Sequence, residues 1–168
     1  FKDDKTRVRK IILPDSLTGM GKNAFQNCVS LTAITIPEKV TILQDMAFFG
    51  CSSLKTVELP SNLGCIYGSV FDNCTSLENI ELPETLTSIG LSAFHACESL
   101  KSIRIPNNVT TIGGSAFANC TSLTDVTLST GICNLPFSLF YNCSSLVNIT
   151  LPDSILTMED QVFGSCYS

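Results

Sequence analysis

The chain has 168 residues, of which 44% are apolar and 15% are charged, and its formal net charge is −5. Residues 1–10 hold five of the ten basic residues, so residues 11–168 hold five basic against thirteen acidic residues. An acidic body argues against nucleic-acid binding, which needs a basic stripe along the contact face. No apolar run approaches the roughly 18 residues of a membrane span, and no charged-then-apolar signal segment stands at the start. We therefore expect no nucleic-acid partner and no membrane insertion.

A fixed period of 23 residues runs through the chain. Without insertion or deletion, cysteine falls on cysteine at Cys28, Cys51, Cys74, Cys97, Cys120, Cys143 and Cys166. A period in this range is typical of solenoids, whose repeats pack only on their neighbours. We expect a single domain, 1–168, with about seven repeats over residues 5–165, numbered here as turns 1 (5–27) to 7 (143–165). Because the chain opens on Phe1 and stops inside an eighth repeat, we expect a fragment of a longer protein.

The first part of each repeat predicts a short main strand. Counting from the cysteine as zero, Leu stands at +3, Ile or Val at +6 and Ile or Leu at +8, as in Leu77, Ile80 and Leu82. Alternate apolar positions point inward in a strand, and the residues between them point outward. Proline at +9, such as Pro83, withholds an N–H from the ladder and begins a turn. Stacked main strands should lie about 4.8 Å apart, in parallel, with right-handed crossovers.

The second part of each repeat predicts a minor strand and then a helical turn. Apolar residues at +12 and +15, as in Leu86 and Ile89, bound the minor strand, and a glycine follows. Beyond it we expect a 3₁₀ or very short α-helical turn, which a serine such as Ser92 can cap. The phenylalanine at +20 recurs in this turn as a second ladder beside the cysteines: Phe25, Phe48, Phe71, Phe94, Phe117, Phe140 and Phe163. We expect both ladders to be structural and inward.

The string C-x-S-L-x-x-I-x-[LI]-P-x-x-[LV]-T-x-I-G-x-x-A-F-x-x-C runs from Cys74 to Cys97 and from Cys97 to Cys120. It resembles the BspA-like (Treponema pallidum-type) class of leucine-rich repeats, and the resemblance covers almost the whole chain. It implies a leucine-rich repeat solenoid and an extracellular or cell-surface location, because members of this family are typically surface or secreted proteins and several are adhesins. It implies no particular binding residue, since the motif consists of core positions.

Nine cysteines and one histidine suggest reactive chemistry, but the repeat argues against it. The ladder cysteines leave their strands in parallel and do not aim at one another, which disfavours disulfides. No C-x₂₋₄-C pair offers a structural zinc site. We interpret the ladder as buried, free thiols, with Cys65 and Cys133 more exposed. His95 has no sequence partner that would make it catalytic. We predict no catalytic residue, no metal site and no cofactor.

Asn73, Asn119 and Asn142, each directly before a ladder cysteine, match the glycosylation sequon. They recur because the repeat places Asn before the cysteine, so we favour a turn or inter-turn hydrogen-bonding role. Turn 6 departs most from the repeat, with Phe137 and Tyr141 at positions that are mostly small or polar elsewhere. We interpret these aromatic residues as compensation for the missing glycine and proline, or alternatively as part of an interface.

The outward main-strand positions +4, +5 and +7 are free of the apolar constraint and can encode a partner. In the three middle turns, +4 and +7 carry charged residues, which we predict to form a ligand-binding patch: Lys55, Glu58, Glu78, Glu81, Lys101 and Arg104. The alternative is cross-strand charge pairing that merely keeps the sheet soluble, at about 0.2–1 kcal/mol per opposite pair. Glu58 and Glu81 stack like on like, which pairing alone would avoid.

These observations predict a non-catalytic recognition module of a cell-surface or secreted protein. Its ligand would be a protein or glycan on a host or microbial surface. Two alternatives remain open. The chain could be a structural spacer or stalk that binds nothing itself, or an accessory domain of a larger secreted protein.

Overall fold

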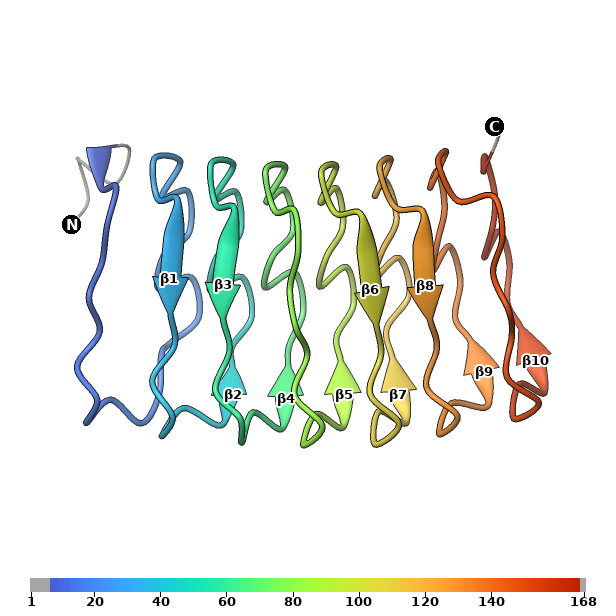
Figure 1. Ribbon diagram of the computed structural model, residues 1–168, viewed down its shortest axis with the longest axis horizontal. Helices are drawn as coiled ribbons and strands as arrows, with labels where there is room; N and C mark the ends of the chain where they lie inside the picture. Colours follow the sequence, from blue (N-terminus) through green and yellow to red (C-terminus); the bar gives the residue numbers. More distant parts are fainter. Residues whose placement is uncertain (1–6, 167–168) are drawn as a thin grey trace.

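The computed structural model describes residues 7–166 as a solenoid that advances by one turn every 23 residues (Figure 1). The first residues of turn 1, from Lys5, and the last two residues of the chain lie outside this range. In Figure 1 the main strands run downward in front and the minor strands run upward behind them, while the chain advances from left to right. The coil is therefore right-handed, and the predicted parallel solenoid is confirmed.

The main strands are three residues long, each with a buried centre between two exposed residues: β1 (Ala33–Thr35), β3 (Thr56–Glu58), β6 (Ser102–Arg104) and β8 (Asp125–Thr127). β1 pairs with β3 and β6 with β8, in parallel and with partners 23 residues apart. Between β3 and β6, turn 4 contributes only an isolated bridge from Asn79 to Thr56. The main strands therefore form separate two-stranded pieces rather than one sheet.

The minor strands are two residues long and more continuous. β2 (Ile42–Leu43), β4 (Cys65–Ile66), β5 (Ser88–Ile89) and β7 (Thr111–Ile112) form one four-stranded parallel sheet in sequence order. β9 (Asn134–Leu135) and β10 (Thr157–Met158) pair separately in the same register. The minor strand predicted between +12 and +15 is thus present, in a shorter form.

The prediction of a helical turn on the third side of each repeat, around positions +18 to +22, is wrong. Every second N–H there donates to the next turn: Met46 to the carbonyl of Gly68 at 2.9 Å, and Phe48 to that of Val70 at 2.9 Å. The residue between them bonds within its own turn, as Ala47 does to the carbonyl of Gln44 at 3.2 Å. An α-helix would direct successive N–H groups along its own axis. This segment instead alternates between local turns and a third inter-turn ladder.

Two positions in each turn, +18 and +22, have a left-handed backbone, which interrupts any helix. At +18 the φ angle is between 51° and 58° in Asn23, Met46, Ser69, Ser92, Ser115, Ser138 and Gln161. At +22 it is between 54° and 70° in Asn27, Gly50, Asn73, Ala96, Asn119, Asn142 and Ser165. Ser92 is therefore not a helix cap. The recurrence of asparagine at +22 follows from its tolerance of this conformation.

The phenylalanine ladder lies in the core, as predicted. Consecutive rings stack with centroids 5.2–5.8 Å apart and interplanar angles of 5–20°, within the range in which aromatic pairs attract. The rings from Phe48 to Phe140 are fully buried, whereas Phe25 and Phe163 at the two ends are partly buried. The ladder therefore runs through all the described turns and is least buried at Phe25 and Phe163.

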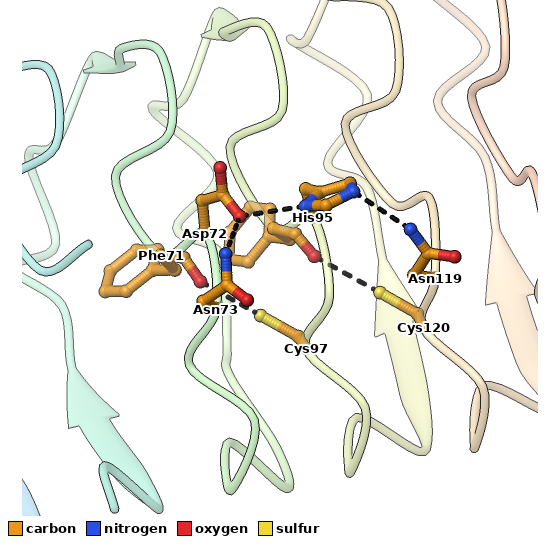
Figure 2. A network of polar contacts seen from close by, with 8 residues as sticks. Phe71, Asp72, Asn73, His95, Cys97, Asn119 and Cys120 are labelled. Atoms are coloured by element: carbon orange, nitrogen blue, oxygen red, sulfur yellow. Dashed lines mark hydrogen bonds and ion pairs between the residues drawn. The ribbon is translucent and has the colours of Figure 1, made fainter. Parts of the chain in front are cut away.

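The cysteine ladder is buried as predicted, and it also makes a hydrogen bond that the sequence did not reveal. From Cys51 to Cys166, each ladder thiol donates to the carbonyl of the phenylalanine 26 residues earlier, as Cys97 does to Phe71 at 3.3 Å and Cys120 to Phe94 at 3.2 Å (Figure 2). Burial raises the pKa of the Cys143 thiol to about 12 and holds the pKa of the Cys97 and Cys120 thiols well above the usual range. The thiols therefore stay protonated, and their protons remain available to the carbonyls.

Candidate binding face

The six predicted patch residues all lie on the main-strand side of turns 3 to 5. Lys55 precedes β3 and Glu58 ends it, while Lys101 precedes β6 and Arg104 ends it. Glu78 and Glu81 flank residues 79–80, where Asn79 makes only the isolated bridge to Thr56. Glu78 is half-buried, and the other five are exposed. The structure therefore places the six on one face, across the break between β3 and β6.

Two shallow grooves border this break. One, of about 560 Å³, lies between β3 and the segment 79–84, and the other, of about 530 Å³, lies between that segment and the β6 residues Ser102 and Arg104. The strands stay together at their beginnings, where the Glu78 N–H donates to Lys55 at 3.4 Å and the Lys101 N–H to Glu78 at 3.3 Å. The grooves therefore open toward the strand ends, where Glu58, Glu81 and Glu84 are among the lining residues.

The residue at +8 distinguishes the closed junctions from the open ones. Where two main strands pair, the +8 residue of the first is isoleucine, and its N–H donates to the next turn: Ile36 to Glu58 at 2.9 Å and Ile105 to Thr127 at 2.8 Å. The +8 residue is leucine in turns 1, 3, 4, 6 and 7. A β-branched side chain favours the extended backbone that a ladder needs. This signal was present in the sequence, and the prediction treated isoleucine and leucine as equivalent.

Pairing within the patch is looser than simple charge matching would give. The Lys55 Nζ lies 4.0 Å from Glu78 Oε1, where the Lys55 side chain is 62% and the Glu78 side chain 44% exposed. Glu58 accepts a hydrogen bond from the Thr35 hydroxyl at 2.8 Å. Arg104 pairs with Glu84, a turn residue that the prediction did not include. Exposed pairs of this kind contribute about 0–1 kcal/mol each, so they do not explain the concentration of charge on this face.

A second polar cluster lies on the third side of turns 3 to 6 (Figure 2). The carboxylate of Asp72 contacts His95 Nδ1 at 2.8 Å and accepts a hydrogen bond from the Asn73 side chain at 2.8 Å. His95 Nε2 contacts the side chain of Asn119 at 2.9 Å. The hydrogen bond that His95 donates to Asp72 raises the pKa of His95, against the opposing effect of burial. The prediction missed Asp72 because the two residues stand 23 positions apart, at equivalent sites of adjacent turns.

The asparagines that directly precede ladder cysteines, Asn73, Asn119 and Asn142, belong to this side of the solenoid. Asn119 and Asn142 are half-buried, and the Asn142 side chain donates to Asn119 Oδ1 at 2.8 Å. Asn73 is exposed and bonds to Asp72. All three have the left-handed backbone described above. The predicted role in turns and inter-turn hydrogen bonds is confirmed.

The two aromatic residues of turn 6 cover glycines of neighbouring turns. The Phe137 ring lies where a side chain on Gly114 would stand, and the Tyr141 ring lies close over Gly164. Phe137 remains 47% exposed. These contacts favour the interpretation as compensation, since each ring fills the space that an adjacent turn leaves empty.

The two cysteines outside the ladder are more accessible than the central ladder cysteines. Cys65 is half-buried and Cys133 is exposed, so the predicted contrast with the buried ladder is confirmed; Cys166, at the open end, is half-buried. Within residues 7–166, no helix is long and apolar enough to cross a membrane.

A model of the BspA-type leucine-rich repeat region matches residues 1–98 and 65–168 of the chain, in six copies. The chain therefore belongs to the BspA-type leucine-rich repeat family, which confirms the resemblance inferred from the repeat motif. A comparison with curated proteins finds no match.

Solved structures agree with this assignment. A leucine-rich repeat protein from Bacteroides ovatus has 38% identity and a TM-score of 0.87, covering 89% of this chain and 39% of its own. The leucine-rich repeat protein of T. pallidum has 36% identity and a TM-score of 0.89, covering 92% of this chain and 75% of its own. A leucine rich cell surface protein from Faecalibacterium prausnitzii has 23% identity and a TM-score of 0.51, covering 91% of this chain and 69% of its own. That last likeness extends to the fold alone.

Proposed function

We propose that this chain is a non-catalytic recognition module of a cell-surface or secreted protein, and that it binds its ligand through the main-strand face of turns 3 to 5. The observation that carries the proposal is the coincidence of the charged patch with the two grooves beside segment 79–84. Side chains of both signs surround an opening in the sheet there. A partner surface can therefore contact charged side chains and fill a groove at the same place.

The chemistry of this face favours a protein ligand over a glycan. Mixed charges at fixed spacing suit electrostatic complementarity with a protein surface, which governs specificity and association rate. The side chains lining the two grooves are charged, amide, hydroxyl and aliphatic, with no aromatic ring among them. A surface location is supported by membership of the BspA-type leucine-rich repeat family.

The alternative, a spacer that displays another domain, is favoured by one observation. Two acidic residues of the patch have a cross-turn partner that offsets their charge, in the Lys55–Glu78 pair and the contact of Thr35 with Glu58. If these contacts are the whole purpose of the charges, the face needs no ligand. An accessory role within a larger secreted protein is compatible with either proposal.

The test replaces Glu58, Glu81 and Arg104 with serine and measures binding to a panel of host-matrix proteins and whole bacterial cells. The matched control replaces Lys39, Glu98 and Asp160 with serine, which makes the same net change of charge at exposed positions outside the patch. Melting temperature is measured for both variants. We expect loss of binding in the patch variant alone, with unchanged melting temperature.

Three results would count against the proposal. Unchanged binding of the patch variant to a ligand that the native chain binds would move the site to another face. Equal loss in both variants would indicate a nonspecific charge effect. If the native chain binds no member of the panel, the spacer becomes the better interpretation.

A further inference from the structure

The polar cluster on the third side of the solenoid is a row of side chains joined across four successive turns. Asp72 is 8% exposed, and its carboxylate lies 2.8 Å from His95 Nδ1. On the far side of the ring, His95 Nε2 lies 2.9 Å from Asn119 Nδ2. Asn119 Oδ1 in turn accepts from Asn142 Nδ2 at 2.8 Å. The four side chains therefore form one uninterrupted chain of hydrogen bonds (Figure 2 shows the first three of them).

The direction of each bond in this row follows from the protonation of one atom. Asp72 accepts, so Nδ1 of His95 carries a proton in either charge state of the ring. Asn119 Nδ2 can only donate, so Nε2 must be an unprotonated acceptor in the arrangement described. If Nε2 takes up a proton from solvent, both facing groups become donors. The Asn119 amide must then rotate by about half a turn, which brings its oxygen to Nε2.

Rotation of the Asn119 amide also changes the hydrogen bond to the next turn. Once the Asn119 oxygen faces His95, its Nδ2 faces Asn142, whose own Nδ2 can no longer donate to it. The Asn142 amide must rotate as well, and offer its oxygen. The exchange needs no movement of the backbone, because an amide rotation interchanges oxygen and nitrogen at nearly the same positions.

We infer that Asp72, His95, Asn119 and Asn142 form a proton-controlled relay, in which protonation of His95 at Nε2 reverses the direction of the two amide hydrogen bonds in turns 5 and 6. The proton comes from solvent, which reaches the ring because its side chain is 32% exposed. No bond other than N–H is made or broken. The relay thus reports solution pH as a change of donor and acceptor pattern two turns from the histidine.

The surroundings of the histidine suit this role. Asp72 is the charged group that faces it from the preceding turn, and the following turn presents Ala118 and Asn119, which do not titrate. The thiols of Cys74 and Cys97 lie within electrostatic reach of Asp72 but stay protonated, because burial raises their pKa well above the usual range. The only proton exchanged near neutral pH in this row is therefore that of His95.

The experiment follows side-chain ¹⁵N and ¹H resonances of the labelled chain by NMR between pH 5 and pH 8. In the native chain, the NH₂ resonances of Asn119 and Asn142 should shift with the same midpoint as the His95 ring. In Asn119→Ala, His95 should still titrate and Asn142 should not. An Asn119 amide that is invariant while His95 titrates would overturn the relay, as would an Asn142 amide that still titrates in Asn119→Ala.

A second variant separates the relay from a merely structural contact. In Asn119→Asp, an ionised carboxylate faces Nε2 and favours the protonated ring, so the His95 midpoint should rise by about 1 pH unit or more. Asn142 can then donate to it at every pH, and its amide should cease to titrate. The matched control is Asn27→Asp, the same change at the same repeat position with the same left-handed backbone. Equal midpoint shifts in both variants, or none in Asn119→Asp, would refute the inference.

Discussion

Removing one ring from the middle of the phenylalanine ladder should show how strongly the stack stabilises the solenoid. Phe94 is fully buried, and its ring stacks at 5.3 Å on both Phe71 and Phe117. Its backbone is held on both sides, because its N–H donates to Ala116 at 2.8 Å and its carbonyl accepts from the Cys120 thiol at 3.2 Å. Neighbouring turns therefore cannot collapse into the space that Phe94→Ala leaves.

A buried Phe→Ala change with little relaxation costs about 3–5 kcal/mol, within which each lost stacking contact accounts for about 0.5–1.5 kcal/mol. Phe25→Ala is the matched control, because Phe25 is only partly buried and, among residues 7–166, stacks on Phe48 alone, at 5.2 Å. We expect it to cost about half as much, since the cost scales with the apolar contact removed. Urea unfolding followed by circular dichroism measures both free energies of unfolding.

The reasoning is refuted if Phe94→Ala costs less than about 1 kcal/mol, because such a loss is typical of a surface position. Equal losses for Phe94→Ala and Phe25→Ala would also contradict it, since the two rings differ in the number of stacked neighbours. A change in the denaturant slope would show that the turns no longer unfold together, and the comparison would then be made residue by residue with hydrogen exchange.

Three further predictions test other parts of the structure. Thiol labelling of the native protein should quickly modify the exposed Cys133, then the half-buried Cys65 and the terminal ladder thiol, and rapid labelling of the remaining ladder would contradict its burial. Replacing Leu59 with Ile should extend the main-strand ladder into the first groove and slow amide exchange at residue 59, and the reverse change at Ile36 should speed exchange there; no change in either would remove the role given to β-branching. His95 has a raised folded-state pKa, so its stabilising contribution is complete below the unfolded value of about 6.5 and is lost as pH rises through the folded value. The stability difference between the native chain and a His95→Gln variant should therefore be larger at pH 5.5 than at pH 8.5, and a difference that grows with pH would reverse the assignment.

Much of the fold could be predicted because the repeat averages out local ambiguity. A single Leu-x-x-Ile segment is a weak signal, but seven copies in register identify the inward positions, and burial of Leu77, Phe94 and Cys97 follows. The helical turn was predicted wrongly because short Ala-Phe segments suit a helix by propensity. What overrides propensity there is the left-handed backbone at Ser92 and Ala96, which lets alternate N–H groups reach the next turn.

The candidate site could be predicted less completely, for a different physical reason. The 23-residue period was enough to predict the main-strand face and the outward direction of Glu58 and Glu81, because these depend only on alternation along a strand. It gave neither the grooves nor the pairing of Arg104 with Glu84, since both depend on where the ladder fails to close. Contacts between side chains one period apart, such as Asp72 with His95, become visible only when two turns are laid side by side.

The left-handed backbone at +18 and +22 also limits how these repeats can diverge. None of the fourteen residues at these positions is β-branched, and a valine, isoleucine or threonine introduced there would be strained in every copy. The exposed main-strand positions carry no such restriction. A library built on this scaffold should therefore diversify +4, +5 and +7 freely while confining +18 and +22 to asparagine, glycine, serine and similarly unbranched residues, so that new specificities arise without loss of the third ladder.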